Sequence, residues 1–254
     1  MNNLKIDLII PVWNTPKVIL TNCLNSVVKN FKGNQCILID DGSTDGSADI
    51  CDSFKLKYPK LFKVIHEENK GNSIARNLGI QTSNADYIMF LDCDDLLVNN
   101  DEIYNTNYSL NWYKFIYIEN NKFKYSYYPV WNTLYKLDTI KALNIHFPTF
   151  KSGYNPGEDW YFNLSLEIKL NQPPIKMISV IMERIIREDS LGNNIKKDKN
   201  FYLNEYDTLF RLYNEMKSSY SPLNIGMHRL LNKMERNLEN YESTLKETNS
   251  VKSI

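Results

Sequence analysis

Four short, mostly apolar runs alternate with stretches of helical periodicity in the N-terminal part of the chain. The runs occupy residues 6–10, 36–39, 62–65 and 87–91. Between the first two, apolar side chains recur three or four residues apart over 20–31. The first two runs start about thirty residues apart, which suits a strand, a crossover helix and a second parallel strand. This alternation predicts an α/β fold with a mostly parallel sheet covered by helices on both faces.

The segments between the runs also carry helix signals. Asp45 or Ser47 is placed to cap a helix that contains apolar side chains up to Phe54. A second short helix is predicted around Ile74, Ala75 and Leu78, and it is expected to end near Gly79 because glycine often ends a helix. These helices would connect the second, third and fourth strands.

The carboxyl ends of the four predicted strands are at 11–14, 40–43, 66–69 and 92–95. Ligands of open α/β sheets bind beyond the carboxyl ends of the strands. Two of these ends are rich in carboxylates, and like charges so close together repel. In the segment "LDCDD", Asp92 and Asp94 suit coordination of Mg²⁺ or Mn²⁺ by oxygen, and the same ion could hold a substrate diphosphate. A divalent cation would therefore offset the repulsion.

Further along, the pattern changes. Many aromatic residues lie within 104–135, and alternation on both sides of Asn120 and Asn121 predicts a β-hairpin. Apolar spacing predicts two more helices, over 206–216 and 225–241, before a polar end. We therefore expect a catalytic domain over residues 1–191 and a small C-terminal helical extension over 192–254.

Composition narrows the classes of function. The 254 residues include 30 basic and 30 acidic side chains, so the chain has no general attraction to nucleic acid or anionic lipid. Its four cysteines show no metal-type spacing and are interpreted as buried thiols of a reducing compartment. No apolar run is long enough to span a bilayer. These features favour a cytoplasmic protein, with peripheral association at the inner membrane face left open.

Three further segments carry candidate chemistry, each with a plainer alternative. The turn at Asp40 and Asp41 could accept hydrogen bonds from the edge of a base, or could simply cap a helix. Arg76 would lie near a helix N-terminus, where its guanidinium could face a phosphate or a base. The plainer alternative is an arginine on the surface of a capped helix. Glu158 and Asp159 precede a helical pattern, where they could supply a general base or a cap.

A basic segment comes last, with Arg184, Arg187 and Ser190. It could form a lid that grips phosphates, or a solvated charged strand.

Taken in order, these segments resemble the family 2 glycosyltransferases, which are inverting enzymes with the GT-A fold. The resemblance covers roughly residues 4–191. It rests on the segments "IIPVWN", "IDDGSTDGS", "NKGNSIARNLGI", "YIMFLDCDD", "VWNTLYKLDTI", "GEDWYFN" and "RIIREDS". The expected architecture is a Rossmann-like, mostly parallel sheet flanked by helices. The first segment departs from the family pattern, where tyrosine is commoner than Trp13.

The resemblance implies a hexosyltransferase-type enzyme that uses a UDP-sugar donor and Mn²⁺ or Mg²⁺. Asp94, with Asp92, would hold the metal, and Asp159 would be the general base with Glu158 beside it. The remaining residues expected to bind the nucleotide-sugar are Pro11, Val12, Asn14, Asp40, Asp41, Arg76, Cys93, Arg184, Arg187 and Ser190. The direct displacement would invert the anomeric centre.

The acceptor is less constrained. A glycan, a lipid-linked or a protein acceptor fits, with surface polysaccharide or glycoconjugate synthesis as the expected setting. Weak candidates for the acceptor side are Trp131, Asn132, Tyr135 and Trp160, although such aromatic side chains more often pack in a core. A homodimer through the C-terminal helices is also among the expected partners.

Two alternatives remain. One is an inactive module that binds nucleotide-sugars, which would be expected to have lost a metal-binding or basic carboxylate. The other is a nucleotidyltransferase, which would need a glycine-rich or basic loop after the first strand. The segment after Ile10 has neither.

Overall fold

The computed structural model describes residues 4–98, 112–124, 129–149, 158–170 and 175–184, with isolated positions between 214 and 243. Within these residues, nine strands form one sheet, which five helices flank. The strand order is β3-β2-β1-β4-β8-β6-β9-β5, and β7 pairs with β6. The predicted boundary at residue 191 and the predicted helix at 206–216 lie almost wholly outside the described residues. The isolated positions within 232–243 are helical.

The first half of the sheet is parallel, as the alternating pattern predicts. It contains β1 (Ile6–Val12), β2 (Gln35–Asp41), β3 (Phe62–Glu67) and β4 (Tyr87–Phe90). The crossover helices are α1 (Lys17–Asn30), α2 (Ser47–Lys57) and α3 (Asn72–Thr82). Helix α2 begins at Ser47 after Gly46 at the N-cap, so the predicted cap by Asp45 or Ser47 is wrong, although the N–H of Ser47 donates to Asp45 Oδ1. Because β1 lies between β2 and β4, their carboxyl ends meet at one edge of the sheet.

The second half of the sheet is mixed. It contains β5 (Leu96–Leu97), β6 (Trp112–Glu119), β7 (Lys122–Lys124), β8 (Thr133–Lys136) and β9 (Ile175–Arg184). Strand β8 is antiparallel to β4 and β6, whereas β9 is parallel to β6 and antiparallel to β5.

The predicted hairpin is confirmed. Strands β6 and β7 pair across Asn120 and Asn121, whose φ angles are 51° and 56°. Consecutive left-handed residues of this kind form tight hairpin turns.

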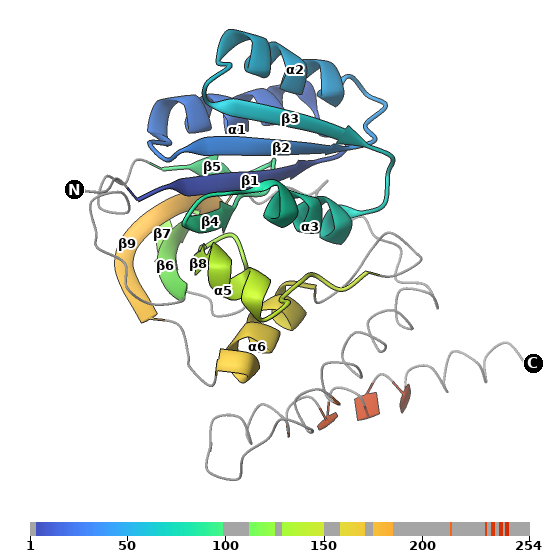
Figure 1. The fold of residues 1–254 in the computed structure, drawn as a ribbon, viewed down its shortest axis with the longest axis vertical. Helices are drawn as coiled ribbons and strands as arrows, with labels where there is room; N and C mark the ends of the chain where they lie inside the picture. Colours follow the sequence, from blue (N-terminus) through green and yellow to red (C-terminus); the bar gives the residue numbers. More distant parts are fainter. Residues whose placement is uncertain are drawn as a thin grey trace, which may run out of the picture.

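Helices cover both faces of the parallel half (Figure 1). Helices α1 and α2 lie on one face, and α3, α5 (Leu137–Ala142) and α6 (Glu158–Leu170) lie on the other. The sequence alternates accordingly along β1, where Leu8 and Ile10 pack in the core cluster under α1 while Ile9 packs in the cluster that includes residues of α6. Burial of both faces explains why the central strands are continuous apolar runs.

The helix predicted around Ile74 corresponds to α3. Its predicted end near Gly79 is wrong, because α3 continues to Thr82. Gly79 lies inside the helix, where a Cβ would stand 2.4 Å from Ile9 Cγ2. This glycine therefore permits close packing of α3 on β1 rather than ending the helix.

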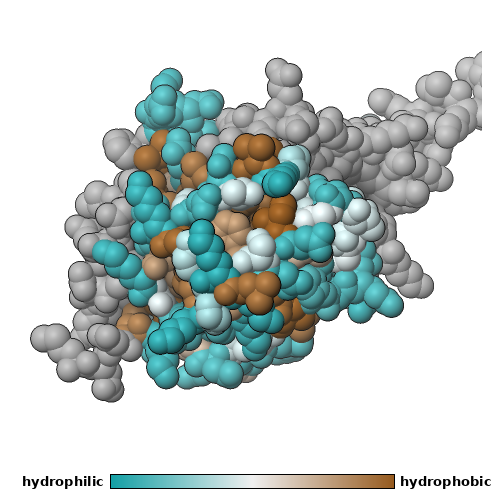
Figure 2. All heavy atoms as spheres, turned by 90° about the horizontal axis from the view of Figure 1, so that it is seen from above, coloured by the Kyte–Doolittle hydropathy of each residue, from teal (hydrophilic) through white to brown (hydrophobic). Residues whose placement is uncertain are grey.

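None of the described helices has the length and apolar character required to cross a membrane. Exposed large hydrophobic side chains include Trp13, Val18 and Leu56. On the face drawn in Figure 2, apolar side chains are interspersed with hydrophilic ones.

Candidate active site

The turns after β1 and β2 are joined by short polar side chains. The N–H groups of Asn14 and Thr15 donate to Ser43 Oγ and Ser47 Oγ, at 3.1 and 3.0 Å. In return, Asn14 Oδ1 accepts from the N–H of Thr44 at 2.7 Å, and Ser47 Oγ donates to the carbonyl of Thr15. Asn14 adopts a left-handed φ of 42°, which asparagine tolerates better than most residues. The two turns therefore form one connected surface.

Asp41 fastens the turn after β3 to this surface. Its Oδ1 accepts from the N–H of Lys70 at 2.7 Å, and its Oδ2 accepts from the N–H of Gly71 at 2.8 Å. Burial raises the pKa of the Asp41 carboxyl, and the two N–H groups oppose that rise. Gly42 has a φ of 68°, and a Cβ there would lie 2.6 Å from Asn69 N. An ionised carboxylate has about four lone-pair sites, so Asp41 retains capacity for a ligand donor.

Asp40 is buried and held on both sides. Its Oδ1 accepts from the N–H of Ser43 at 3.1 Å, while its Oδ2 lies 2.8 Å from His66 Nδ1. The other ring nitrogen of His66 lies 3.3 Å from Asp52 Oδ1. The hydrogen bond to Asp40 is the main reason that the pKa of His66 is raised. Asp40 thus fixes the shape of the turn.

Trp13 is the residue at this edge that sequence reasoning left out of the candidate set. Its side chain is 44% exposed, whereas Pro11 and Val12 are buried at the end of β1. An exposed indole beside Asn14 offers a flat surface for a planar ring. Its place in the motif, where the family more often has tyrosine, was the signal that could have identified it.

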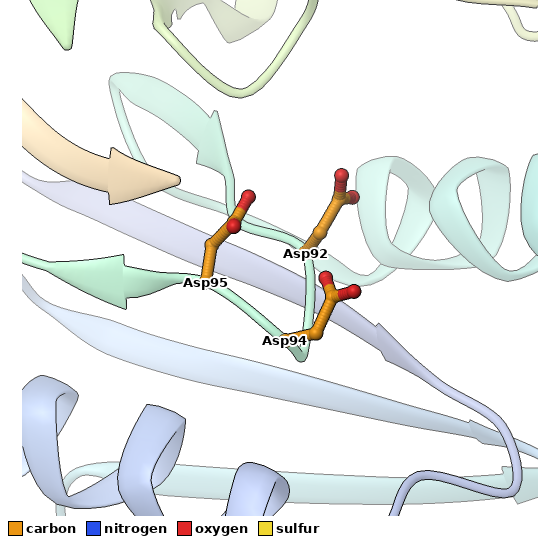
Figure 3. A group of neighbouring side chains, drawn as sticks. All are labelled: Asp92, Asp94 and Asp95. Carbon is orange, nitrogen blue, oxygen red and sulfur yellow. The ribbon is translucent and has the colours of Figure 1, made fainter. Parts of the chain in front are cut away.

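The acidic turn after β4 gathers three carboxylates (Figure 3). Asp92, Asp94 and Asp95 each offer an oxygen within 4.8 Å of the others, and in this view all three side chains project to the same side of the turn. The turn is closed by the N–H of Asp95, which donates to the carbonyl of Asp92 at 3.0 Å. Three hard oxygen donors this close suit Mg²⁺ or Mn²⁺. The residues present therefore fit the predicted metal, with Asp95 as an additional, buried candidate.

Cys93 connects the acidic turn to the first turn. Its Sγ lies 3.1 Å from Thr15 Oγ1. Burial, followed by the charge of Asp94, raises the pKa of its thiol to about 12, so Cys93 stays protonated at neutral pH. Cys93 is therefore a packing and hydrogen-bonding residue of the site rather than a nucleophile.

Arg76 lies at the centre of the charged part of the site. It lies one turn into α3, which begins at Asn72, and is 2% exposed. Its Nη2 donates to Asp92 Oδ1 at 2.8 Å and its Nη1 to Glu158 Oε1 at 3.2 Å, while Asp159 Oδ1 lies 3.5 Å from Nη1. Burial by itself would lower the pKa of Arg76, but these three carboxylates outweigh it and raise that pKa. One guanidinium therefore bridges the acidic turn and the start of α6.

Glu158 and Asp159 lie in the first turn of α6, as the helical pattern after them predicts. Asp159 Oδ2 accepts from the N–H of Val130 at 3.2 Å. Burial, followed by the charge of Asp159, raises the pKa of Glu158 to about 7, although Arg76 opposes the rise. A carboxyl whose pKa lies near neutrality can exchange protons at working pH.

A second connection links α3 and α6. Asn77 Nδ2 donates to the carbonyl of Phe147 at 2.9 Å, and Asn77 Oδ1 accepts from the N–H of the same residue at 2.8 Å. The ring of Phe147 stacks on Phe162 of α6, with centroids 4.3 Å apart and planes 18° apart. It also packs against the guanidinium of Arg76, 5.2 Å from its centroid. Sequence reasoning missed Asn77 and Phe147, because only the fold brings them together.

The remaining predicted residues divide into three groups. Arg184 is exposed at the end of β9, where its Nη1 donates to Glu119 Oε2 at 3.0 Å and its guanidinium lies 5.9 Å from the ring centroid of the buried Trp131. Asn132 and Tyr135 are fully buried. For Tyr135, this burial favours the alternative that the ring packs in the core. Arg187, Ser190 and the side chain of Trp160 lie outside the described residues.

The arrangement combines an α/β fold, connected turns at the carboxyl ends of β1, β2 and β3, a carboxylate cluster after β4 and an acidic pair at the start of α6. Residues 7–154 match the family model described as Glycosyl transferase family 2. The chain belongs to this family of glycosyltransferases.

Curated relatives agree with the assignment. The chain is 38% identical over 97 residues to "Glycosyltransferase GlyG" of Streptococcus pneumoniae, an alignment that covers 37% of this chain and 32% of that protein. It is 41% identical over 100 residues to "Minor teichoic acid biosynthesis protein GgaA" of Bacillus subtilis, covering 37% of this chain and 22% of that protein. The matched segment thus spans less than a third of either relative.

Solved structures show the same fold. The chain aligns with S. aureus TarS 1-349 in complex with UDP-GlcNAc at a TM-score of 0.69 and 17% identity, covering 94% of this chain and 71% of that one. It aligns with the mannosyltransferase PcManGT of Pyrobaculum calidifontis, in complex with GDP-Man and Mn²⁺, at a TM-score of 0.66 and 12% identity, covering 98% and 76%. The predicted GT-A fold is therefore confirmed.

Proposed function

We propose that the protein is an inverting, metal-dependent glycosyltransferase that moves a sugar from a UDP-sugar to an acceptor hydroxyl. The observation that carries the proposal is the bridge made by Arg76, which brings the metal-suited Asp92 turn together with Glu158 and Asp159. A transferase of this kind needs both groups at one centre, since one serves the leaving diphosphate and the other serves the attacking hydroxyl.

The donor would occupy the edge formed by the turns after β1, β2 and β4. The exposed ring of Trp13 would stack on the base, while Asp41 would accept a base N–H. Asp94 and Asp92 would hold Mn²⁺ or Mg²⁺, which supplies charge neutralisation of the departing diphosphate. The complexes of PcManGT with Mn²⁺ and of TarS with UDP-GlcNAc support the metal and the donor, respectively.

Chemistry would take place in one displacement. Asp159 would accept the proton of the acceptor hydroxyl, whose oxygen then forms a bond to the anomeric carbon. The bond between that carbon and the diphosphate breaks, and the nucleoside diphosphate leaves with the electron pair. Because the attack is in line, an α-linked donor would give a β-glycoside. Arg184, with Arg187 and Ser190, is proposed to serve the diphosphate, for which the exposed guanidinium of Arg184 would exchange its ion pair with Glu119.

The setting proposed is surface polysaccharide or glycoconjugate synthesis. The relative GgaA carries a name from minor teichoic acid biosynthesis, which supports a glycopolymer acceptor. Residues 1–191 are proposed as the catalytic unit and 192–254 as a helical extension that recruits an acceptor, a membrane surface or a second copy.

The proposal is tested by measuring release of nucleoside diphosphate from a panel of UDP- and GDP-sugars, with and without Mn²⁺. We expect turnover with a UDP-sugar that depends on Mn²⁺. Turnover of GDP-sugars alone would overturn the donor assignment. Turnover that is unaffected by chelation of divalent cations would overturn the proposed metal dependence.

The base is tested with Asp159→Asn. This variant should bind the donor nucleotide as the wild type does and lose transfer about 10²- to 10⁴-fold, the usual effect of removing a general base. Asp138→Asn is the matched control, because Asp138 is an exposed acid in the first turn of α5. Equal transfer by Asp159→Asn and Asp138→Asn would remove Asp159 from this role.

A further inference from the structure

Arg76 faces more negative charge than it can neutralise. Its single positive charge meets Asp92 at 2.8 Å, Glu158 at 3.2 Å and Asp159 at 3.5 Å. The guanidinium is almost fully buried, and the ring of Phe147 packs against it. A buried arginine with such partners is held strongly, since moving the guanidinium away would leave several partly buried carboxylates uncompensated.

These contacts give Arg76 a role other than the nucleotide contact expected from the sequence. We propose that Arg76 is a positioning residue: its contacts with Glu158 and Asp159 set the orientation of Asp159 relative to the Asp92 turn. This inference rests on the proposed function, because it concerns the relation between the donor side and the base of that reaction.

Geometry favours positioning over direct donor contact. The two terminal nitrogens point at carboxylates on different elements, Nη2 at the acidic turn and Nη1 at the start of α6. The guanidinium is planar, so these two directions are fixed relative to one another. Turning Arg76 towards a nucleotide would break at least one of these buried contacts. A rigid bridge is therefore the arrangement that these contacts support.

The neighbouring residue strengthens the bridge. Asn77 holds the backbone of Phe147 with two hydrogen bonds, and Phe147 stacks on Phe162, one turn along α6 from Asp159. Helix α3 therefore holds α6 twice, by charge through Arg76 and by packing through Asn77. Even small misplacement of a catalytic group lowers the rate steeply, because the reacting atoms must meet in line.

The first test is Arg76→Lys, which keeps the charge and loses the planar fork. We expect kcat for transfer to fall about 10-fold or more, while KM for the donor and the affinity for UDP change less than about threefold. If Arg76 instead grips the nucleotide, KM for the donor will rise and kcat will hold, and that result would overturn the inference. A lower melting temperature with no selective loss of kcat would indicate a purely structural role and would overturn it equally.

The second test needs no turnover. Arg76→Met removes a positive charge beside Asp92, so Mn²⁺, followed by electron paramagnetic resonance without nucleotide, should bind about threefold more tightly or better. Lys141→Met is the control, since Lys141 Nζ donates to the carbonyl of Ser83, away from the acidic turn. Unchanged or weaker Mn²⁺ binding by Arg76→Met would contradict the contact with Asp92.

The two proposals fail in different ways. If the wild type turns over no nucleotide-sugar, the proposed function fails, and the Mn²⁺ comparison still tests the link from Arg76 to Asp92. If the wild type is active and Arg76→Lys retains full kcat, the positioning role fails alone. If Arg76→Met does not fold, the Arg76→Lys kinetics decide the question.

Discussion

Two regions of the site are held in place by different kinds of interaction: the donor side, which here means the turns after β1, β2 and β3, and the start of α6. Hydroxyl, amide and carboxylate side chains join the turns after β1, β2 and β3 to nearby backbone groups, as Ser47 and Asp41 illustrate. The start of α6 depends on the ion pairs of Glu158 and Asp159 with the buried Arg76. The first kind of contact fixes the shape of a loop, whereas the second fixes the separation of two distant elements.

This difference has consequences for charge. On the donor side, burial raises the pKa of Asp41, and two backbone N–H groups oppose that rise. At the start of α6, Glu158 and Asp159 share Arg76 with Asp92. The pKa of Glu158 is raised to about 7. The rise in the pKa of Asp41 is therefore opposed mainly by backbone N–H groups, whereas the pKa of Glu158 is set by burial, a neighbouring acid and a buried arginine.

The largest effect on stability is expected on the donor side. Asp41→Ala leaves the N–H groups of Lys70 and Gly71 without their acceptor and detaches the turn after β3. Hydrogen bonds to a charged group contribute about 1.5–3 kcal/mol each, and Lys70 N can turn to water, so we expect a loss of roughly 2–3 kcal/mol. Urea denaturation measures this free energy of unfolding.

Asp45→Ala is the matched control for that variant. Asp45 lies in the same turn, is exposed, and accepts from the N–H of Ser47 at 3.0 Å. Losing an exposed hydrogen bond of this kind costs about 1 kcal/mol or less. If both variants lose the same stability, the buried bonds of Asp41 do not hold the turns together, and the donor side does not depend on them as the structure indicates.

A smaller and opposite effect is expected at α6. The folded pKa of Glu158 is about 7, above its unfolded value of ~4.3, so the folded protein holds this proton more tightly. Stability from this group is fully present below the unfolded pKa and declines as pH rises through the folded pKa. Glu158→Gln keeps an acceptor for Arg76 without the charge, so its melting temperature should exceed that of the wild type by a few degrees at pH 8.

The gain should shrink towards pH 4.5, where the wild-type Glu158 is protonated in the folded state. Asp138→Asn removes the same charge from an exposed helix start and should bring no gain at either pH. A melting temperature for Glu158→Gln below that of the wild type at pH 8 would mean that the ion pair with Arg76 outweighs the burial of Glu158.

Sequence reasoning was most successful where the signal is local. The parallel half of the sheet and the hairpin at Asn120 follow from apolar periodicity and turn residues. The end of α3 could not be predicted in this way, because a glycine commonly marks a helix end. Only the packing of Gly79 on Ile9 shows why this glycine lies inside the helix. The mixed half of the sheet depends on pairing between segments as distant as β5 and β9, which no local pattern encodes.

The candidate site shows the same division. The carboxylates of the Asp92 turn could be recognised as one cluster because they are neighbours in sequence. The bridge from Arg76 to Glu158 spans 82 positions, and the clamp from Asn77 to Phe147 spans 70. Such contacts depend on the packed fold, so motifs locate the residues while the structure supplies their partners.

The smallest effect tests the donor side by titration. The pKa of His66 is raised, mainly by its hydrogen bond with Asp40 and further by Asp52. The pKa of His66 is raised because Asp40 stabilises the charged imidazolium. The pKa of Glu158 is raised because burial destabilises the charged carboxylate. Stability from His66 is therefore fully present below its unfolded pKa of ~6.5 and lost as pH rises through the folded pKa. His66→Gln should lower the melting temperature slightly at pH 5.5 and leave it unchanged at pH 9.

Asp52→Asn separates the two partners of that histidine. Because the bond with Asp40 is the larger cause, this variant should reduce the pH dependence contributed by His66 without abolishing it. His66 is 44% exposed, so solvent screening keeps the whole effect small. Equal losses for His66→Gln at pH 5.5 and pH 9 would show that the imidazole acts by packing alone. The donor side would then lack the charge-dependent contact that the structure gives it.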